Sequence, residues 1–79
     1  IETGNGTHTI VTGSGNDKIT TGNGVDTINA GGGNNNISSG AGNDSVTTGS
    51  GNDKINAEAG AGDTCSAGGG NNNVTNCEL

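Results

Sequence analysis

A nine-residue repeat constrains this chain more than any other feature. Glycines recur at every ninth position from Gly4 to Gly49, and each is followed by a second glycine two residues later. Eight such repeats fill residues 3–75, with a one-residue slip near 57–59. So many glycines exclude a helix, and repeats this short bury apolar side chains only by stacking on one another. The sequence therefore predicts a solenoid.

Each repeat divides into a six-residue turn and a three-residue strand. The turn has glycine at its second and fourth positions, where the backbone needs positive φ or a close approach to another segment. The strand places one apolar residue between polar ones, which is the alternation of a half-buried strand. The eighth positions form the predicted core row: Ile10, Ile19, Ile28, Ile37, Val46, Ile55, Cys65 and Val74.

The domain is predicted to be single, over residues 1–79. Ile1 and Glu2 take the eighth and ninth positions of a repeat whose turn is missing, so we expect that another coil preceded them. Residues 76–79 are expected to form a C-terminal cap. The first coil would then be open to end-to-end contacts.

Composition limits what can hold such a fold together. The 79 residues include 18 glycines and no Phe, Trp, Tyr or Met, so the core is small and the unfolded chain has high entropy. We therefore expect that binding of something outside the chain stabilises the fold.

The net charge of the chain limits which classes of ligand or partner it can bind. The net charge is −6 and the cations are two lysines, Lys18 and Lys54, which argues against nucleic acid and favours cations. No apolar run is long enough for insertion in a membrane. One histidine and the absence of an acid pair in an apolar pocket give no support for catalysis, so we expect no enzyme.

The sixth position of the turn supplies candidate metal ligands. Nearly all of these residues offer oxygen, which suits Ca²⁺ better than zinc or copper. His8 is interpreted as a variant turn residue, because no second histidine supports a transition-metal site. The sixth-position residues are His8, Asp17, Asp26, Asn35, Asp44, Asp53, Asp63 and Asn72.

The segments TGSGNDKIT, TGNGVDTIN, SGAGNDSVT and TGSGNDKIN resemble the repeats-in-toxin nonapeptide, G-G-x-G-x-D-x-U-x with U apolar. The resemblance implies an all-β, right-handed parallel β-roll of about four coils, with two repeats per coil and two sheets of short strands. It also implies several Ca²⁺ ions, bound by the sixth-position side chains other than His8 and by turn carbonyls. Those carbonyls lie near Gly13, Gly15, Gly22, Gly24, Gly31, Gly33, Gly40, Gly42, Gly49 and Gly51.

Two repeats per coil would place the turns at two edges. One edge would stack His8, Asp26, Asp44 and Asp63, and the other would stack Asp17, Asn35, Asp53 and Asn72. Each ion would lie between a turn and the turn 18 residues on. We expect tighter binding on the first edge, because carboxylates raise affinity for Ca²⁺.

Cys65 and Cys77 would form one disulfide in a secreted chain and remain two thiols in a cytosolic one. The tail DTCSAGGGNNNVTNCE is similar to the ends of secreted bacterial proteins with such repeats, where paired cysteines close the last coil.

The resemblance implies a calcium-binding structural module of a larger secreted bacterial protein or adhesin, which folds on Ca²⁺ after secretion. The alternative is a surface that binds ice or a polysaccharide. It would use an uncharged outer face with Thr9, Val11, Thr27, Asn29, Ser45, Thr47, Thr64 and Ser66.

Overall fold

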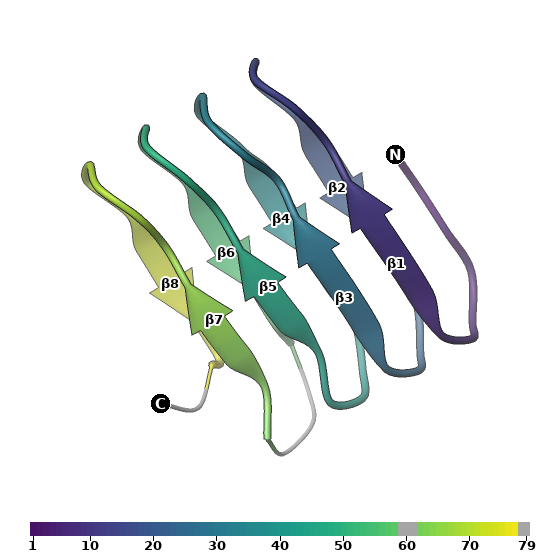
Figure 1. Cartoon of the computed structure of the whole chain (residues 1–79). Coiled ribbons are helices and arrows are strands. Elements are labelled where there is room, and N and C mark those ends of the chain that lie inside the picture. Colours follow the sequence, from purple (N-terminus) through teal and green to yellow (C-terminus); the bar gives the residue numbers. More distant parts are fainter. Residues whose placement is uncertain (59–61, 78–79) are drawn as a thin grey trace.

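The computed structural model of the chain describes residues 1–58 and 62–77, and these form a β-solenoid of about four coils (Figure 1). The described residues contain eight strands and no helix, as the repeat predicts. The strands are β1 (His8–Val11), β2 (Lys18–Thr20), β3 (Asp26–Asn29), β4 (Asn36–Ser38), β5 (Ser45–Thr47), β6 (Lys54–Asn56), β7 (Thr64–Ser66) and β8 (Asn73–Thr75). Nothing in this part of the chain is a helix that could span a membrane.

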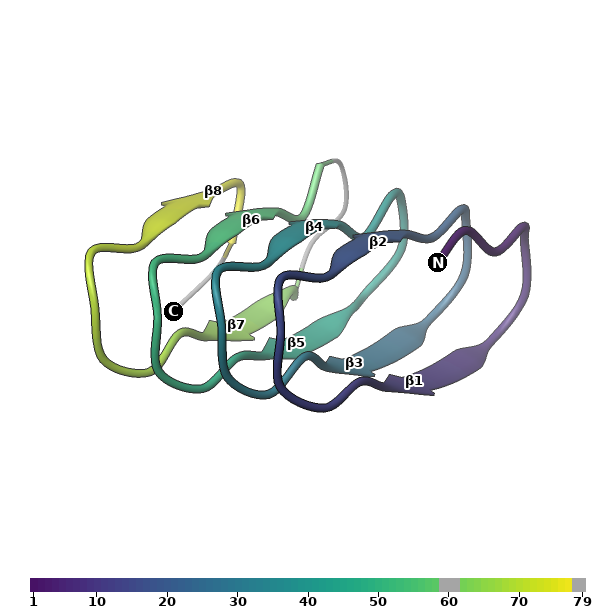
Figure 2. The same ribbon diagram turned by 90° about the horizontal axis from the view of Figure 1, so that it is seen from above.

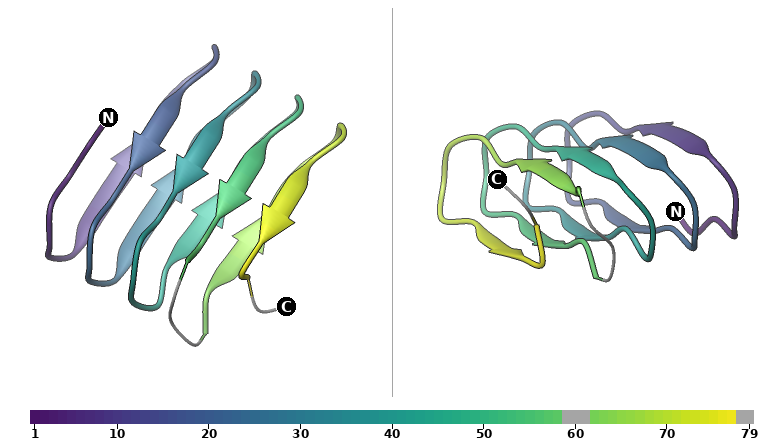
Figure 3. Two further views of the ribbon diagram at one scale, coloured as in Figure 1. Left: turned by 180° about the vertical axis from the view of Figure 1, so that it is seen from behind. Right: turned by 90° about the horizontal axis from the view of Figure 1, so that it is seen from below.

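Consecutive strands lie in opposite sheets, so one coil contains two repeats. One sheet has the order β1-β3-β5-β7 and the other β2-β4-β6-β8, with every pair parallel (Figures 2 and 3). The register aligns Ile10 with Ile28 and Ile19 with Ile37, a step of 18 residues. The predicted β-roll with two sheets of short strands is confirmed.

The core is the row of eighth-position side chains between the sheets. Ile19, Ile37 and Ile55 are completely buried, and all the predicted positions from Ile10 to Cys65 are buried. The prediction was wrong for Val74, which remains 39% exposed. Val74 pairs with Ile55 in register, but β8 is the last strand of its sheet among the described residues, so no further strand in this part of the chain covers its far side. Ala30 and Ala57 join the core from first positions of the turn.

The one-residue slip appears in the strand register. Ser45 pairs with Thr64 and Lys54 with Asn73, steps of 19 instead of 18. The extra residue therefore lies between Asn56 and Thr64. Residue 59 of the slip predicted near 57–59, and residues 78–79 of the predicted cap, lie outside the described residues.

The two ends of the solenoid differ: residues 1–2 pair with β2 at one end, and a disulfide closes the last coil at the other. Glu2 forms a parallel bridge with Thr20, and the Ile1 amino group donates to the carbonyl of Lys18 at 2.6 Å, so residues 1–2 lie alongside β2 as a preceding strand would. At the other end Cys65 of β7 forms a disulfide with Cys77, with the two Cα atoms 5.9 Å apart. The expected pairing is present.

Stacked turns approach one another so closely that the fourth position must be glycine. Gly42 has φ of 119°, and a Cβ built there would lie 1.9 Å from the carbonyl oxygen of Gly24. The Gly24 amide donates to the carbonyl of Ala41 at 3.0 Å. Backbone contact between coils therefore packs the polar turns as tightly as the apolar row packs the strands.

Candidate metal centre

The turns gather at two opposite edges of the solenoid. We call the edge with His8, Asp26, Asp44 and Asp63 the carboxylate edge, and the edge with Asp17, Asn35, Asp53 and Asn72 the asparagine edge. In Figure 1 the carboxylate edge is at the lower right and the asparagine edge at the upper left. Both stacks have the composition that the sequence predicts.

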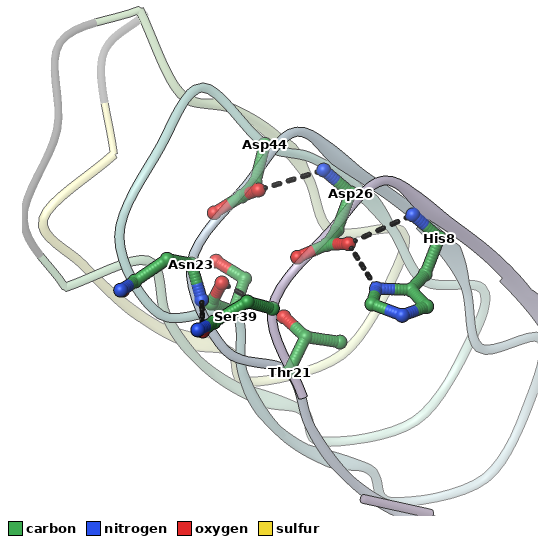
Figure 4. A network of polar contacts seen from close by, with 7 residues as sticks. His8, Thr21, Asn23, Asp26, Ser39 and Asp44 are labelled. Carbon is green, nitrogen blue, oxygen red and sulfur yellow. Dashed lines mark hydrogen bonds and ion pairs between the residues drawn. The ribbon is translucent and has the colours of Figure 1, made fainter. Parts of the chain in front are cut away.

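After the first residue of each stack, one side-chain oxygen of every Asp or Asn accepts a hydrogen bond from the coil before. Oδ1 of Asp44 accepts the backbone N–H of Asp26 at 2.9 Å (Figure 4). Oδ1 of Asp63 accepts the backbone N–H of Asp44 at 2.7 Å. On the asparagine edge, Oδ1 of Asp53 accepts a hydrogen bond from the backbone N–H of Asn35 at 2.9 Å. The ladder continues from Asp17 to Asn35 and from Asp53 to Asn72. The sixth position thus fixes the spacing of the coils.

The second oxygen of every aspartate is buried without a hydrogen bond to any described residue. This holds for Oδ2 of Asp17, Asp26, Asp44, Asp53 and Asp63. The side chains of Asp26 and Asp44 are 0% and 2% exposed. A buried carboxylate oxygen with no donor and no counter-charge is strongly unfavourable, so these turns need a cation.

Asn35 shows what surrounds that second atom. Its Oδ1 makes the same bond as the aspartates do, and its Nδ2 donates to the carbonyls of Ala30, Gly31 and Gly33, each at 3.3 Å. Asn72 is similar, with Nδ2 at 2.9 Å from the oxygen of Gly68 and 3.5 Å from that of Gly70. By repeat symmetry, an aspartate points a carboxylate oxygen at such carbonyls. Carboxylate and carbonyl oxygens together fit Ca²⁺.

Burial raises the pKa of the Asp44 carboxyl above its ordinary value. The backbone N–H of Asp26 acts in the opposite direction, and so does the nearby Ser39 hydroxyl, although the latter is not in hydrogen-bond geometry. The negative charges of Asp26 and Asp63 raise the pKa further. Without a metal, the surroundings of Asp44 therefore disfavour its ionised state.

His8 is the first residue in the stack of the carboxylate edge. Its Nδ1 lies 2.9 Å from Oδ1 of Asp26, the same oxygen that accepts the His8 backbone N–H. The imidazole is therefore placed against Asp26 as a neighbour in the stack. Oδ2 of Asp26 still has no partner among the described residues.

Side-chain clusters alone do not reveal these sites. Within the described residues, no three His, Cys, Asp or Glu side chains converge on a point where they could hold a metal. A cation here would need backbone carbonyls to complete its ligands, and Ca²⁺ commonly accepts them.

Sequence reasoning missed the hydroxyls at the first position of the turn. The Thr21 hydroxyl donates to the carbonyl of Ser39 at 2.8 Å, and the Ser39 hydroxyl is buried without a partner among the described residues. Figure 4 shows both beside the carboxylates of Asp26 and Asp44. The signal was available, because the first position carries Thr or Ser in nearly all the turns that end in Asp.

Comparison with known proteins agrees with this geometry. The model of the RTX calcium-binding nonapeptide repeat, which comprises four copies of the repeat, matches residues 2–37, 31–62 and 38–74. Comparisons with curated proteins and with solved structures found no match. The matched ranges cover almost the whole chain and include every candidate aspartate, and the chain therefore belongs to the family of RTX calcium-binding nonapeptide repeats.

Proposed function

We propose that this chain is an extracellular structural module of a larger secreted bacterial protein, and that it folds when it binds several Ca²⁺ ions. The observation that carries the proposal is the set of buried Oδ2 atoms without partners on Asp17, Asp26, Asp44, Asp53 and Asp63. The family is one of structural calcium-binding repeats, which supports a role without catalysis.

The carboxylate edge is the stronger candidate for tight binding. Asp26, Asp44 and Asp63 follow one another in consecutive coils, so adjacent turns bring two carboxylates together. On the asparagine edge, Asn35 separates Asp17 from Asp53. Because each carboxylate raises affinity for Ca²⁺, the carboxylate edge should fill first.

Folding and binding should be one event. The apolar core is small and consists of Ile, Val, Ala and Cys side chains between the two sheets. Without a cation, the stacked carboxylates of the carboxylate edge repel one another and remain desolvated, as the raised pKa of Asp44 reflects. A ligand that binds only the folded state stabilises that state, so calcium shifts the equilibrium from coil to solenoid. Such a chain would stay unfolded where free calcium is low and fold outside the cell.

The test is a calcium titration followed by circular dichroism, starting from a sample in EDTA, with MgCl₂ as the control. We expect a cooperative change from coil to β signal with Ca²⁺ and little change with Mg²⁺, which demands a smaller and more regular octahedral site. A full β signal in EDTA that calcium does not alter would contradict the proposal.

A second candidate function is ice binding, which the register of the sheet β1-β3-β5-β7 favours. Thr9, Thr27, Ser45 and Thr64 align in one outward row, and Val11, Asn29, Thr47 and Ser66 in another. All of these residues are exposed and none is charged. The opposite sheet presents Lys18 and Lys54 instead.

Thermal hysteresis of the calcium-loaded protein tests this second function. If the face binds ice, T27Y together with T47Y should abolish hysteresis, whereas N36Y on the opposite sheet should leave it intact. A protein without hysteresis lacks this function, and glycan binding by the isolated chain would then identify a polysaccharide surface.

A further inference from the structure

We propose that the side-chain amides of Asn35 and Asn72 take the place of a calcium ion, so that their turns fold without one. The chain would then contain two kinds of turn. Carboxylate turns end in Asp17, Asp26, Asp44, Asp53 or Asp63 and need a cation, and amide turns end in Asn35 or Asn72 and need none. This inference rests on the calcium-binding function proposed above.

The hydrogen bonds of Asn35 leave no room for an ion in its turn. The side chain is buried, with Oδ1 accepting from the N–H of Asp17 at 2.9 Å and Nδ2 surrounded by three carbonyl oxygens at 3.3 Å. A carboxylate turn presents an unpartnered Oδ2 instead. The NH₂ group of Asn35 thus supplies the positive character that the carbonyls of a carboxylate turn obtain from a cation.

The orientation of the amide follows from its partners. With Oδ1 and Nδ2 exchanged, Nδ2 would face the N–H of Asp17, and Oδ1 would face the oxygens of Ala30, Gly31 and Gly33. For Asn35 to coordinate an ion inside its turn, the amide would have to turn in this way and break the bond between coils. An ion in this turn is therefore unfavourable.

The first position of the turn varies together with the sixth. Thr12, Thr21, Ser39 and Thr48 belong to carboxylate turns, whereas Ala30 and Ala67 belong to the two amide turns. The hydroxyls of Ser39 and Thr48 are buried without partners among the described residues. In a carboxylate turn, the hydroxyl of Thr or Ser places a polar group beside the carboxylate and its cation. In an amide turn, the methyl group of Ala takes that place, because the amide has all its hydrogen bonds without a further polar group. Ala57 departs from the pattern, in the turn that contains the slip.

This assignment means that the asparagine edge needs fewer cations than the carboxylate edge. Its carboxylate turns, with Asp17 and Asp53, alternate with the amide turns of Asn35 and Asn72. Each aspartate of this edge therefore has a turn beside it that is satisfied without a metal.

The first test counts bound ions by native mass spectrometry of the calcium-loaded chain, with N35D and N72D as the variants. Each substitution should add one Ca²⁺ per molecule. The matched controls are N36D and N73D, which make the same change of charge at the next residue, where the side chain is exposed on a strand. These controls should leave the count unchanged.

The outcomes distinguish this inference from the proposed function. An unchanged count in N35D and N72D, with tighter binding alone, would mean that the asparagines already hold ions, and would overturn the inference. A wild-type chain that binds no Ca²⁺ under any of these conditions would instead overturn the proposed function.

The reciprocal variant D53N keeps the inference testable if N35D fails to fold. D53N should bind one ion fewer than the wild type, because an amide then fills the turn. Its β signal by circular dichroism in EDTA should be stronger than that of the wild type, since a desolvated carboxylate becomes a hydrogen-bonded amide. A weaker β signal in EDTA, or an unchanged count of ions, would contradict the inference.

Discussion

The two edges are built from the same nine-residue repeat but satisfy their buried polar groups in different ways. On the asparagine edge a second ladder, at the fifth position, joins Asn16, Asn34, Asn52 and Asn71 through side-chain oxygens and backbone N–H groups at 2.7 to 2.8 Å. On the carboxylate edge that position holds Thr7, Val25, Asn43 and Gly62, and the described residues form no such ladder there. One edge therefore carries more neutral hydrogen bonds, and the other depends on charge that a cation must balance.

The largest effect should come from the fourth-position glycines, and it should be the same on both edges. A Cβ at Gly42 on the carboxylate edge would lie 1.9 Å from a backbone oxygen, and one at Gly33 on the asparagine edge 2.1 Å. Because positive φ and overpacking each cost about 1 to 3 kcal/mol, G42A and G33A should each lower stability by about 3 kcal/mol or more. Thermal unfolding with saturating calcium measures this.

G4A is the control on the carboxylate edge, since nothing lies within 4 Å of its Cβ and its φ is not positive. It should change stability by less than about 1 kcal/mol. Strong damage from G42A with none from G33A would mean that packing as well as charge separates the edges.

Reduction of the Cys65–Cys77 disulfide should have the second-largest effect on stability. The bridge closes a loop of 12 residues in sequence separation, and loop-closure entropy gives about 3 kcal/mol for a loop of this size. We expect the reduced protein to need more calcium to fold, as measured by circular dichroism with and without a reductant. The bridge lies at the last coil and should not change which edge binds more tightly, so a reversed order of the edges would contradict the account.

The two edges should differ in their response to the loss of a carboxylate. Asp44 has Asp26 and Asp63 as neighbours in the stack, whereas Asp53 has Asn35 and Asn72. D44N should therefore raise the calcium concentration at half-folding by about tenfold, equivalent to about 1.4 kcal/mol, and D53N by less. If D44N and D53N raised the calcium concentration at half-folding equally, the two edges would not differ in their affinity for calcium.

The smallest effect should be a pH dependence of the calcium-free protein. The folded-state pKa of Asp44 is raised above its ordinary value of 3.8, so the folded state binds more protons than the unfolded state between these two values. Stability in EDTA should therefore increase as the pH falls through the folded pKa toward 3.8. The β signal in EDTA, recorded by circular dichroism for the wild type and for D44N across this pH range, measures this, and an equal pH dependence in D44N would exclude Asp44 as its origin.

The periodicity of the sequence determines most of this architecture. A repeat of nine with one apolar residue per strand predicted the buried row, and the two repeats per coil that the family resemblance implies predicted both stacks of turns. The prediction that Val74 is buried was wrong, because burial depends on having a neighbouring strand on each side and not on the position in the repeat. The pattern could not show that Oδ1 binds the preceding coil while the second atom faces the turn carbonyls. That difference separates Asn35 from the aspartates.

Anomalous scattering from crystals of the calcium-loaded chain would show which turns hold calcium, because it locates the ions individually. We expect calcium peaks in the turns of Asp26, Asp44 and Asp63 and none in the turns of Asn35 and Asn72. A peak in the turn of Asn35, with its Nδ2 turned away from the carbonyls of Ala30, Gly31 and Gly33, would contradict this expectation.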